Sequence, residues 1–378
     1  MNLNVSANSI KFDTPLILAS GRITETADFF LKAKKFGCGG MVTRSLKKEI
    51  PPNRKQTPAP RYAVFDKDSM LNCEWGNEKS WEYWRDNGIQ EVQKVNSPII
   101  VSLSGREIEG CKYLIKAFDE LCVSAYEINV SCPHSGALNG NLNIDGEHLL
   151  EILKQVRPIT KTPIWIKLSY SPFIVAMAKV AEKEGADTIV CTNTIGPGLL
   201  LDIETSKPKL GIKGGRGGLS GKAIFPIALE CVYEISQAVK IPIIGVGGIS
   251  SSEGVVQMFM AGASAVQLYT APALKGATMF KEIATGLKQF LVSHKYPSLA
   301  ELVGISHQWA KENQFSSPRP NIVVESCRGC KKCHDSCNFN AINFRQMDRR
   351  VVANINENCI ACNACVGICE HKAIQASY

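Results

Sequence analysis

The sequence predicts an α/β fold, a closed (β/α)8 TIM barrel, followed by a small cysteine-rich domain. Short apolar runs rich in β-branched residues alternate with segments of helical periodicity from residue 14 to about 290. Eight of the fifteen cysteines then fall within residues 327–369, in two runs of matching spacing. We therefore expect a barrel over residues 1–292, a linker over 293–325 and a separate domain over 326–378.

The apolar runs are the expected barrel strands. Several are apolar on both faces, as is usual for a parallel sheet that is covered by helices. Helical periodicity is clearest at Ser171–Lys183 and Phe225–Val239. Eight β/α units over roughly 250–280 residues favour a closed barrel over an open doubly wound sheet. The expected strands are Pro15–Ala19, Gly40–Ser45, Pro98–Ser104, Ala125–Val130, Pro163–Ser169, Thr188–Thr192, Ile241–Val246 and Ala265–Thr270.

Three connections are longer than a simple β/α unit needs. Residues 46–80 are rich in proline, lysine and aromatic residues, 133–146 carry glycine and asparagine, and 196–221 are rich in glycine. Long glycine-containing loops on a barrel usually form lids or binding loops. We expect these three segments to lie near the functional site.

Composition excludes several classes of function. A hydrophobic content of 45% and a charged content of 21% are ordinary for a globular protein. The net charge of +8 is spread along the chain without a basic, aromatic-rich block, which disfavours nucleic-acid binding. The N-terminal residues lack a signal-peptide pattern and no long apolar run is present. We expect a cytoplasmic protein with no membrane partner, in which clustered cysteines bind metal rather than form disulfides.

The C-terminal cysteines form two runs with the spacing C-x2-C-x2-C-x3-C, which begin at Cys327 and Cys359. This is the spacing of bacterial two-cluster ferredoxins, in which the fourth cysteine of each run ligates the other 4Fe–4S cluster. Structural zinc usually takes separated pairs of ligands instead. Asn338 and Glu370 replace the proline that usually follows the fourth cysteine. The expected ligands are Cys327, Cys330, Cys333 and Cys369 for one cluster, and Cys337, Cys359, Cys362 and Cys365 for the other.

Two adjacent clusters conduct electrons, so we expect the barrel to hold a redox cofactor. No G-x-G-x-x-G motif follows an expected strand, which argues against a nicotinamide site of the Rossmann type. A flavin fits better, because it exchanges single electrons with clusters and hydride with a substrate.

A reactive cysteine follows the fourth expected strand, in Asn129-Val130-Ser131-Cys132-Pro133-His134. The end of a barrel strand is a rigid position whose side chains point toward a ligand. Cys132 there can act as a proton donor or as a nucleophile. The alternative is a buried cysteine with only a packing role.

Other strand ends suit a flavin. Gly247 and Gly248 let backbone N–H groups approach a phosphate just before a helix start, although a plain tight turn is the alternative. Lys167 ends an apolar strand and needs a partner, which an anionic flavin ring edge would supply. Amide and hydroxyl groups of Thr192-Asn193-Thr194 could bind a polar planar ring.

Taken together, these residues, with Gly217-Gly218-Leu219-Ser220-Gly221, resemble the FMN barrel of the dihydroorotate and dihydropyrimidine dehydrogenases, over about residues 10–290. Leu71-Asn72-x-Glu74, Glu78-Lys79-Ser80-x3-Trp84, His134 and the two-cluster tail resemble the dihydropyrimidine dehydrogenases in particular. One departure is Arg44, which stands where these families usually have a lysine.

The resemblance implies roles for individual residues. Cys132, with Ser131 and His134 beside it, would exchange a proton with the substrate carbon next to the one that exchanges hydride. Asn72, Asn129, Asn193 and Thr194 would bind the pyrimidine ring. The implied flavin-binding residues are Ala19, Ser20, Gly21, Arg44, Ser45, Ser102, Asn129, Lys167, Thr192, Gly218, Ser220, Gly247, Gly248, Tyr269 and Thr270.

The expected activity is reduction of the 5,6 double bond of uracil, thymine or a related cyclic enamide, with electrons entering through the clusters. The donor would be ferredoxin or an NAD(P)H-dependent FAD/iron–sulfur subunit, in a homodimer or heterotetramer. One alternative is a dihydroorotate dehydrogenase that passes electrons to ferredoxin. Another, of a different class, is an electron-transfer flavoprotein subunit without its own substrate.

Overall fold

The computed structural model divides the chain into two units, Met1–Gln308 and Trp309–Tyr378. For residues 142–145 and 310–311 the structure describes the backbone alone. The residues described are 2–49, 58–74, 78–130, 142–212, 214–311, 318–347 and 350–377.

Eight parallel strands close into a barrel in the first unit, in the order β10-β13-β14-β3-β4-β7-β8-β9. All eight expected strands are confirmed, each with ends at or inside the expected bounds. Their burial explains why they form: β9 (Ile164–Leu168) and β13 (Ile243–Val246) are buried at every position. The other strands are β3 Leu16–Leu18, β4 Gly40–Val42, β7 Ile99–Ser104, β8 Ala125–Asn129, β10 Thr188–Cys191 and β14 Ala265–Leu268.

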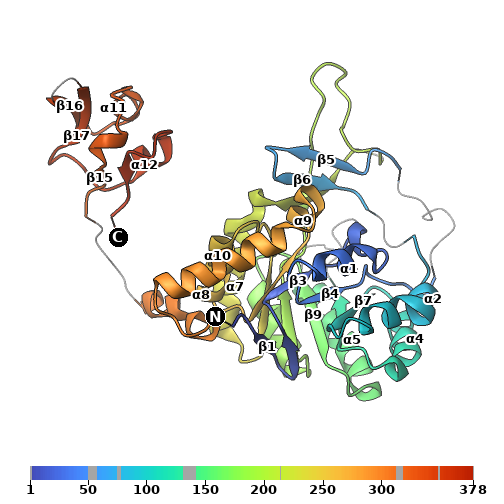
Figure 1. Ribbon diagram of the computed structural model, residues 1–378. Helices are drawn as coiled ribbons and strands as arrows, with labels where there is room; N and C mark the ends of the chain where they lie inside the picture. The colour runs from blue at the N-terminus through green and yellow to red at the C-terminus, as the bar shows by residue number, and fades with distance from the viewer. Residues whose placement is uncertain are drawn as a thin grey trace. The chain divides into compact units, whose positions relative to one another are not determined.

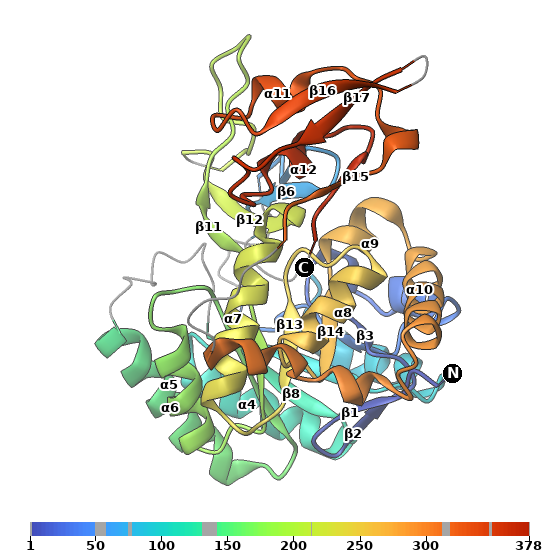
Figure 2. The ribbon, with the colours of Figure 1, turned by 90° about the vertical axis from the view of Figure 1, so that its left-hand side faces the viewer.

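Amphipathic helices follow the strands and pack outside the barrel, as Figure 2 shows for α4, α5, α6 and α10. In α4 the buried residues are Gly110, Cys111, Leu114, Ile115 and Phe118, which recur at helical spacing on one face. The helices are α1 Asp28–Lys34, α2 Trp81–Tyr83, a π-helical turn Trp84–Gly88, α3 Ile89–Gln93, α4 Ile108–Phe118, α5 Leu142–Val156, α6 Ile174–Lys183, α7 Phe225–Ala238, α8 Ser252–Met260, α9 Thr270–Lys275 and α10 Met279–Ser293.

An N-terminal hairpin closes the bottom of the barrel. Its strands are β1 (Val5–Ala7) and β2 (Ile10–Phe12), and they pack antiparallel. Phe12 joins the apolar cluster inside the barrel, with its ring centroid 6.5 Å from that of Trp165. The N-terminal end is thus filled with apolar side chains, which leaves the C-terminal ends of the strands for polar groups.

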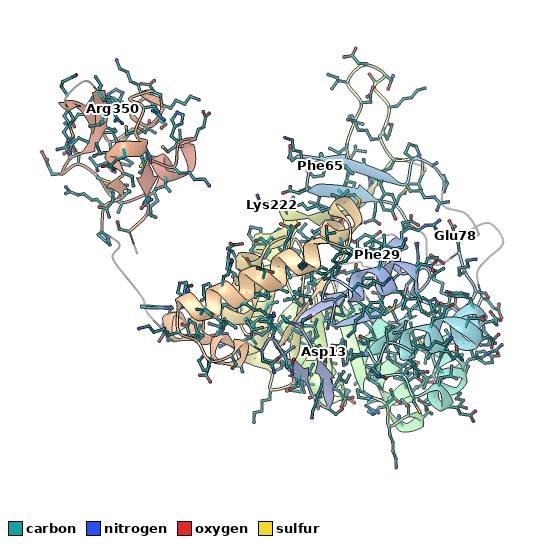
Figure 3. All side chains as sticks on the ribbon, viewed as in Figure 1. Asp13, Phe29, Phe65, Glu78, Lys222 and Arg350 are labelled. Carbon is teal, nitrogen blue, oxygen red and sulfur yellow. The ribbon has the colours of Figure 1, made fainter. Side chains whose placement is uncertain are left out.

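Two of the long connections form an antiparallel sheet, in the order β11-β12-β6-β5. Its strands are β5 Tyr62–Phe65, β6 Ser69–Asn72, β11 Ile195–Gly198 and β12 Gly217–Gly221. Figure 1 shows β5 and β6 beyond one end of the barrel, with the hairpin between β11 and β12 projecting further. In Figure 3, Phe65 and Lys222 lie toward this end and Asp13 toward the other. Residues 133–141 of the third connection lie outside the described ranges.

Past α10 the chain continues with the 3-10 helices Leu299–Leu302 and Ile305–Lys311, and the first unit ends within the second of them, at Gln308. Leu299 and Leu302 are buried, and His307 Nε2 lies 2.9 Å from Ser236 Oγ and 3.0 Å from the Ala261 carbonyl oxygen. These contacts tie part of the expected linker to the barrel.

The described residues of the second unit form two β-ribbons and two short helices. Its core joins Cys327 and Cys333 with Ile342, Val352 and Ile374. The two helices, α11 and α12, each begin after a residue with positive φ, Lys331 and Asn363, that follows the second cysteine of a run. The elements are β15 Asn321–Ile322, a 3-10 turn Val324–Ser326, α11 Lys332–Asp335, β16 Ile342–Met347, β17 Arg350–Ile355, α12 Ala364–Ile368 and β18 Ile374–Gln375.

None of the helices in the described ranges is long and apolar enough to span a bilayer.

Candidate functional site

A cleft opens at the C-terminal ends of the barrel strands. It encloses about 580 Å³ of empty space, part of it open to solvent, which is in the size range of small-molecule sites. Most of the residues expected to bind a cofactor or a ring line it. These are Ala19, Ser20, Lys167, Thr192, Asn193, Thr194, Ser220, Gly247, Gly248, Tyr269 and Thr270.

The glycine pair after β13 forms one wall of this cleft. Gly247 and Gly248 have φ values of 130° and 71°, which favour glycine. A Cβ on Gly248 would lie 2.7 Å from Phe225 Cβ and 2.8 Å from the Gly221 carbonyl oxygen. The turn leads into α8, where Ser251 caps the helix by accepting a hydrogen bond of 3.3 Å from Gly254 N–H. The wall thus offers backbone and a helix N-terminus, the features that bind phosphate.

Lys167 is buried, only 4% exposed, and its ammonium group contacts buried side chains of two other barrel strands. Its Nζ donates to Glu127 Oε1 at 3.4 Å and to Gln267 Oε1 at 3.3 Å. The partner that the sequence demanded for this lysine is therefore present within the protein. Lys167 and Gln267 line the cleft, and Glu127 lies behind them at 0% exposure.

Hydrogen bonds connect this ion pair to two of the asparagines expected to bind substrate. Ser102 Oγ donates to Glu127 Oε1 at 3.3 Å and lies 2.9 Å from Ser45 Oγ. Asn129 Nδ2 donates to Ser45 Oγ at 3.2 Å. Asn193 Nδ2 in turn donates to Asn129 Oδ1 at 3.2 Å. These hydrogen bonds connect Ser45, Ser102 and Asn129 to the site, although the three residues do not line the cleft.

Asn72 and Gly218 lie beside each other in the antiparallel sheet. They are register partners, and Asn72 Nδ2 donates to the Gly218 carbonyl oxygen at 3.2 Å. Gly21 packs against the ring of Tyr269, since a Cβ there would come within 2.1 Å of Tyr269 Cε2. Of these four residues, Tyr269 lines the cleft, and Asn72, Gly218 and Gly21 do not.

Arg44 belongs to a charged cluster rather than to the cleft wall. Its guanidinium lies 3.2 Å from Glu25 and 2.8 Å from Glu74, and all three side chains are largely buried. A planar guanidinium can contact two carboxylates at once, which a lysine ammonium does less well. This accounts for an arginine at a position where lysine was expected.

Two tyrosines adjoin this charged cluster. Tyr62 Oη lies 3.2 Å from Tyr269 Oη, and Arg22 N–H donates to Tyr269 Oη at 3.2 Å. Burial raises the pKa of both phenols, so both hydroxyls stay protonated at neutral pH.

Sequence reasoning missed two residues of this site, Glu127 and Gln267. A signal was present, because each is a polar residue between two apolar neighbours in a buried strand. The three residues expected to carry the proton chemistry, Ser131, Cys132 and His134, lie outside the described residues.

The cysteine-rich unit has its own cavity, which encloses about 600 Å³ of empty space that is partly open to solvent. Three sulfur atoms accept backbone hydrogen bonds: Cys327 from Ala353 at 3.4 Å, Cys359 from Ala361 at 3.4 Å and Cys369 from Ala373 at 3.2 Å. In the described ranges, no group of three or more His, Cys, Asp or Glu side chains is arranged to hold a metal ion. The cluster ligation therefore stays a prediction. Cysteines of both runs line this cavity: Cys333, Cys337, Cys359, Cys362 and Cys365.

Comparison with known proteins assigns the barrel to a family. The dihydroorotate dehydrogenase family profile matches residues 2–291 and so ends before the cysteine-rich unit. Relatives named dihydroorotate dehydrogenase B (NAD(+)), catalytic subunit, include a Pyrococcus abyssi protein, 34% identical over 305 residues, which span 80% of this chain and 99% of the relative. The Thermodesulfovibrio yellowstonii protein is 35% identical over 305 residues, 80% of this chain and 98% of the relative. The narrower assignment to dihydropyrimidine dehydrogenases is not supported by these relatives. The chain belongs to the dihydroorotate dehydrogenase family.

Proposed function

We propose that this protein is an FMN-dependent oxidoreductase that interconverts dihydroorotate and orotate and exchanges electrons through its cysteine-rich unit. The observation that carries the proposal is the cleft at the C-terminal ends of the strands in a barrel of this family. Lys167, Asn193 and Gly248 all line this one cleft. The names of the relatives support this substrate over uracil or thymine.

The residues of the cleft fit FMN. The backbone of Gly247 and Gly248, with the start of α8, would hold the phosphate. Lys167, Thr192 and Ser20 would hold the ring system. When bound, FMN supplies hydride exchange with a substrate carbon and single-electron exchange with clusters.

Substitution of Gly248 by alanine tests the phosphate wall. The new Cβ meets Phe225 and the Gly221 carbonyl at under 3 Å, so we expect the variant to lose most of its FMN affinity. We also expect about 1–3 kcal/mol of lost stability from backbone strain. Titration of the apoprotein with FMN and thermal unfolding measure the two effects.

Gly276→Ala is the matched control for that variant. Gly276 also has positive φ, 82°, but nothing lies within 4 Å of its Cβ position. It should lose some stability and keep its FMN affinity. If Gly248→Ala binds FMN as tightly as Gly276→Ala, the glycine pair is not the phosphate site.

The chain's own residues handle the substrate ring and the proton. Amides of Asn72, Asn129 and Asn193 offer both donors and acceptors, which match the alternating groups of a pyrimidine. Cys132 would remove a proton from a ring carbon during dihydroorotate oxidation and return it in the reverse direction. An ordinary thiol pKa of about 8.5 makes both roles accessible near neutral pH.

Electrons would leave through two 4Fe–4S clusters in the second unit. The support is the double C-x2-C-x2-C-x3-C spacing and the cavity lined by cysteines of both runs. Backbone N–H groups that donate to Cys327, Cys359 and Cys369 are the kind of contact that tunes cluster potentials. The partner would be a ferredoxin or an NAD(P)H-dependent FAD/iron–sulfur subunit, with the catalytic chain in a homodimer or heterotetramer.

One observation favours a second candidate, reduction of a neutral pyrimidine. Glu74 lies two residues after Asn72, and Arg44 is already neutralised by Glu25 and Glu74. Arg22 and Arg61 both contact Glu78. The guanidinium groups of Arg22, Arg44 and Arg61 thus have carboxylate partners, and no arginine is among the described residues that line the cleft. Both observations favour a ring that carries no carboxylate of its own.

A substrate comparison decides between the two. Anaerobic protein is mixed with dihydroorotate or with dihydrouracil, and bleaching of the flavin absorbance is followed. We expect dihydroorotate to be preferred by about 100-fold or more in kcat/KM, since a site that binds a carboxylate rejects an analogue without it. The reverse preference would establish the second candidate. Reduction by neither would favour an electron-transfer subunit.

A further inference from the structure

Glu127 is a buried carboxylate for which the proposed function has no role. It lies on β8 at 0% exposure and receives hydrogen bonds from three other barrel strands, β7, β9 and β14. A carboxylate in such a place costs free energy unless every oxygen is satisfied and its charge is compensated. A buried charge at this position therefore needs a structural or functional reason.

The hydrogen bonds around Glu127 account for both of its oxygens. Oε1 accepts from Lys167 at 3.4 Å and from Ser102 at 3.3 Å, and Oε2 accepts from Gln267 Nε2 at 2.9 Å. Gln267 Oε1 accepts from Lys167 at 3.3 Å. The reverse orientation of the Gln267 amide would turn its NH2 group toward the ammonium. The carboxylate and the ammonium therefore dictate how Gln267 is oriented.

The Glu127 carboxylate also determines which hydroxyl donates in each hydrogen bond between the serines. Because Glu127 only accepts, Ser102 must use its single proton to donate to it. Ser45, 2.9 Å from Ser102, must then donate to Ser102 and accept from Asn129 Nδ2. Ser20 Oγ, 3.5 Å from Ser45 Oγ, is left to act as a second donor.

The same order of donors and acceptors determines how the side-chain amides of Asn129 and Asn193 are oriented. With Nδ2 of Asn129 pointing to Ser45, its Oδ1 accepts from Asn193 Nδ2 at 3.2 Å. Asn193 Oδ1 then accepts from Thr194 N–H at 2.8 Å. A carboxylate several hydrogen bonds away thus sets the orientation of two amides, of which that of Asn193 lines the cleft.

We infer that Glu127 is a positioning residue with two outputs: it holds Lys167 against the cleft as the counter-charge to its ammonium, and it orients the amides of Asn129 and Asn193 through Ser102 and Ser45. The inference rests on the flavin and ring sites of the proposed function. The first output sets the reduction potential of the bound flavin, because Glu127 offsets part of the positive charge beside it. The second output sets substrate affinity.

Two variants separate the outputs. Glu127→Gln removes the counter-charge and keeps the side-chain shape. We expect a positive shift of the flavin midpoint potential, equivalent to about tenfold tighter binding of the reduced flavin, or about 30 mV for a two-electron couple. Ser102→Ala breaks the serine chain and removes one hydrogen bond from Glu127, but it keeps the negative charge of Glu127. We expect a smaller shift of the potential than in Glu127→Gln, with about a tenfold rise in substrate KM.

The measurements are the potential of the bound flavin by equilibrium dye titration without substrate, and the KM and kcat of the intact protein. An unchanged potential in Glu127→Gln overturns the first output. An unchanged KM in Ser102→Ala overturns the second, and this variant stays informative if Glu127→Gln does not fold. A parent protein without flavin would instead refute the proposed function, so the two failures are distinguishable.

Discussion

Replacement of Cys132 by alanine is expected to lower turnover by about 100- to 10,000-fold, the usual contribution of a positioned acid or base. The flavin and iron contents should stay at the parent level, because the methyl group removes a proton-transfer group and no proposed ligand. The reason is chemical: hydride leaves one ring carbon only if the neighbouring carbon loses its proton. Steady-state kcat and absorbance spectra measured on the same preparation test this expectation.

Cys122→Ala is the matched control. Cys122 is an exposed cysteine that precedes β8, the strand after which Cys132 follows. It should retain full turnover. A Cys132→Ala protein with parent-like kcat would remove Cys132 from the reaction and leave the proton to another group.

The second large effect is expected in the cysteine-rich unit. Replacement of Cys362, an exposed cysteine of the second run, by alanine should remove one cluster, so that iron falls from about eight to about four atoms per chain. Electron transfer to a soluble one-electron acceptor should fall at least about 100-fold, because electrons would have lost half of their path. Flavin reduction by substrate, measured by rapid mixing, should stay at the parent rate, because that step occurs in the barrel.

Asn343→Ala offers a control in the same unit, since Asn343 is an exposed residue of β16 that carries no thiol. It should keep its iron and its rate of electron transfer. Zinc in place of iron in the parent protein, or parent-like transfer in Cys362→Ala, would contradict a conducting role for this unit.

Local patterns were enough to predict the barrel and part of the site. The strand β13 and its glycine pair could be read directly, because an apolar run followed by Gly247-Gly248 is a local signal. The need of Lys167 for a partner was also evident from its apolar neighbours. Its partner was not, because Glu127 is 40 residues away and Gln267 is 100 residues away along the chain.

The antiparallel sheet illustrates the same limit. Residues 46–80 and 196–221 were expected to be binding loops, yet they supply β5, β6, β11 and β12. Asn72 and Gly218 are neighbours there although 146 residues separate them. Arg44 likewise could be recognised as unusual, but its position between Glu25 and Glu74 required the folded chain.

By itself, the sequence determined the order of the β/α units, the spacing of the cysteines and the residue types at the strand ends, because each of these is encoded within a short stretch. The tertiary structure decided which of those side chains meet: closure of the barrel brings β7, β8, β9 and β14 around one carboxylate. Hydrogen bonds and ion pairs depend on distances between strands, and those distances exist only once the barrel is closed.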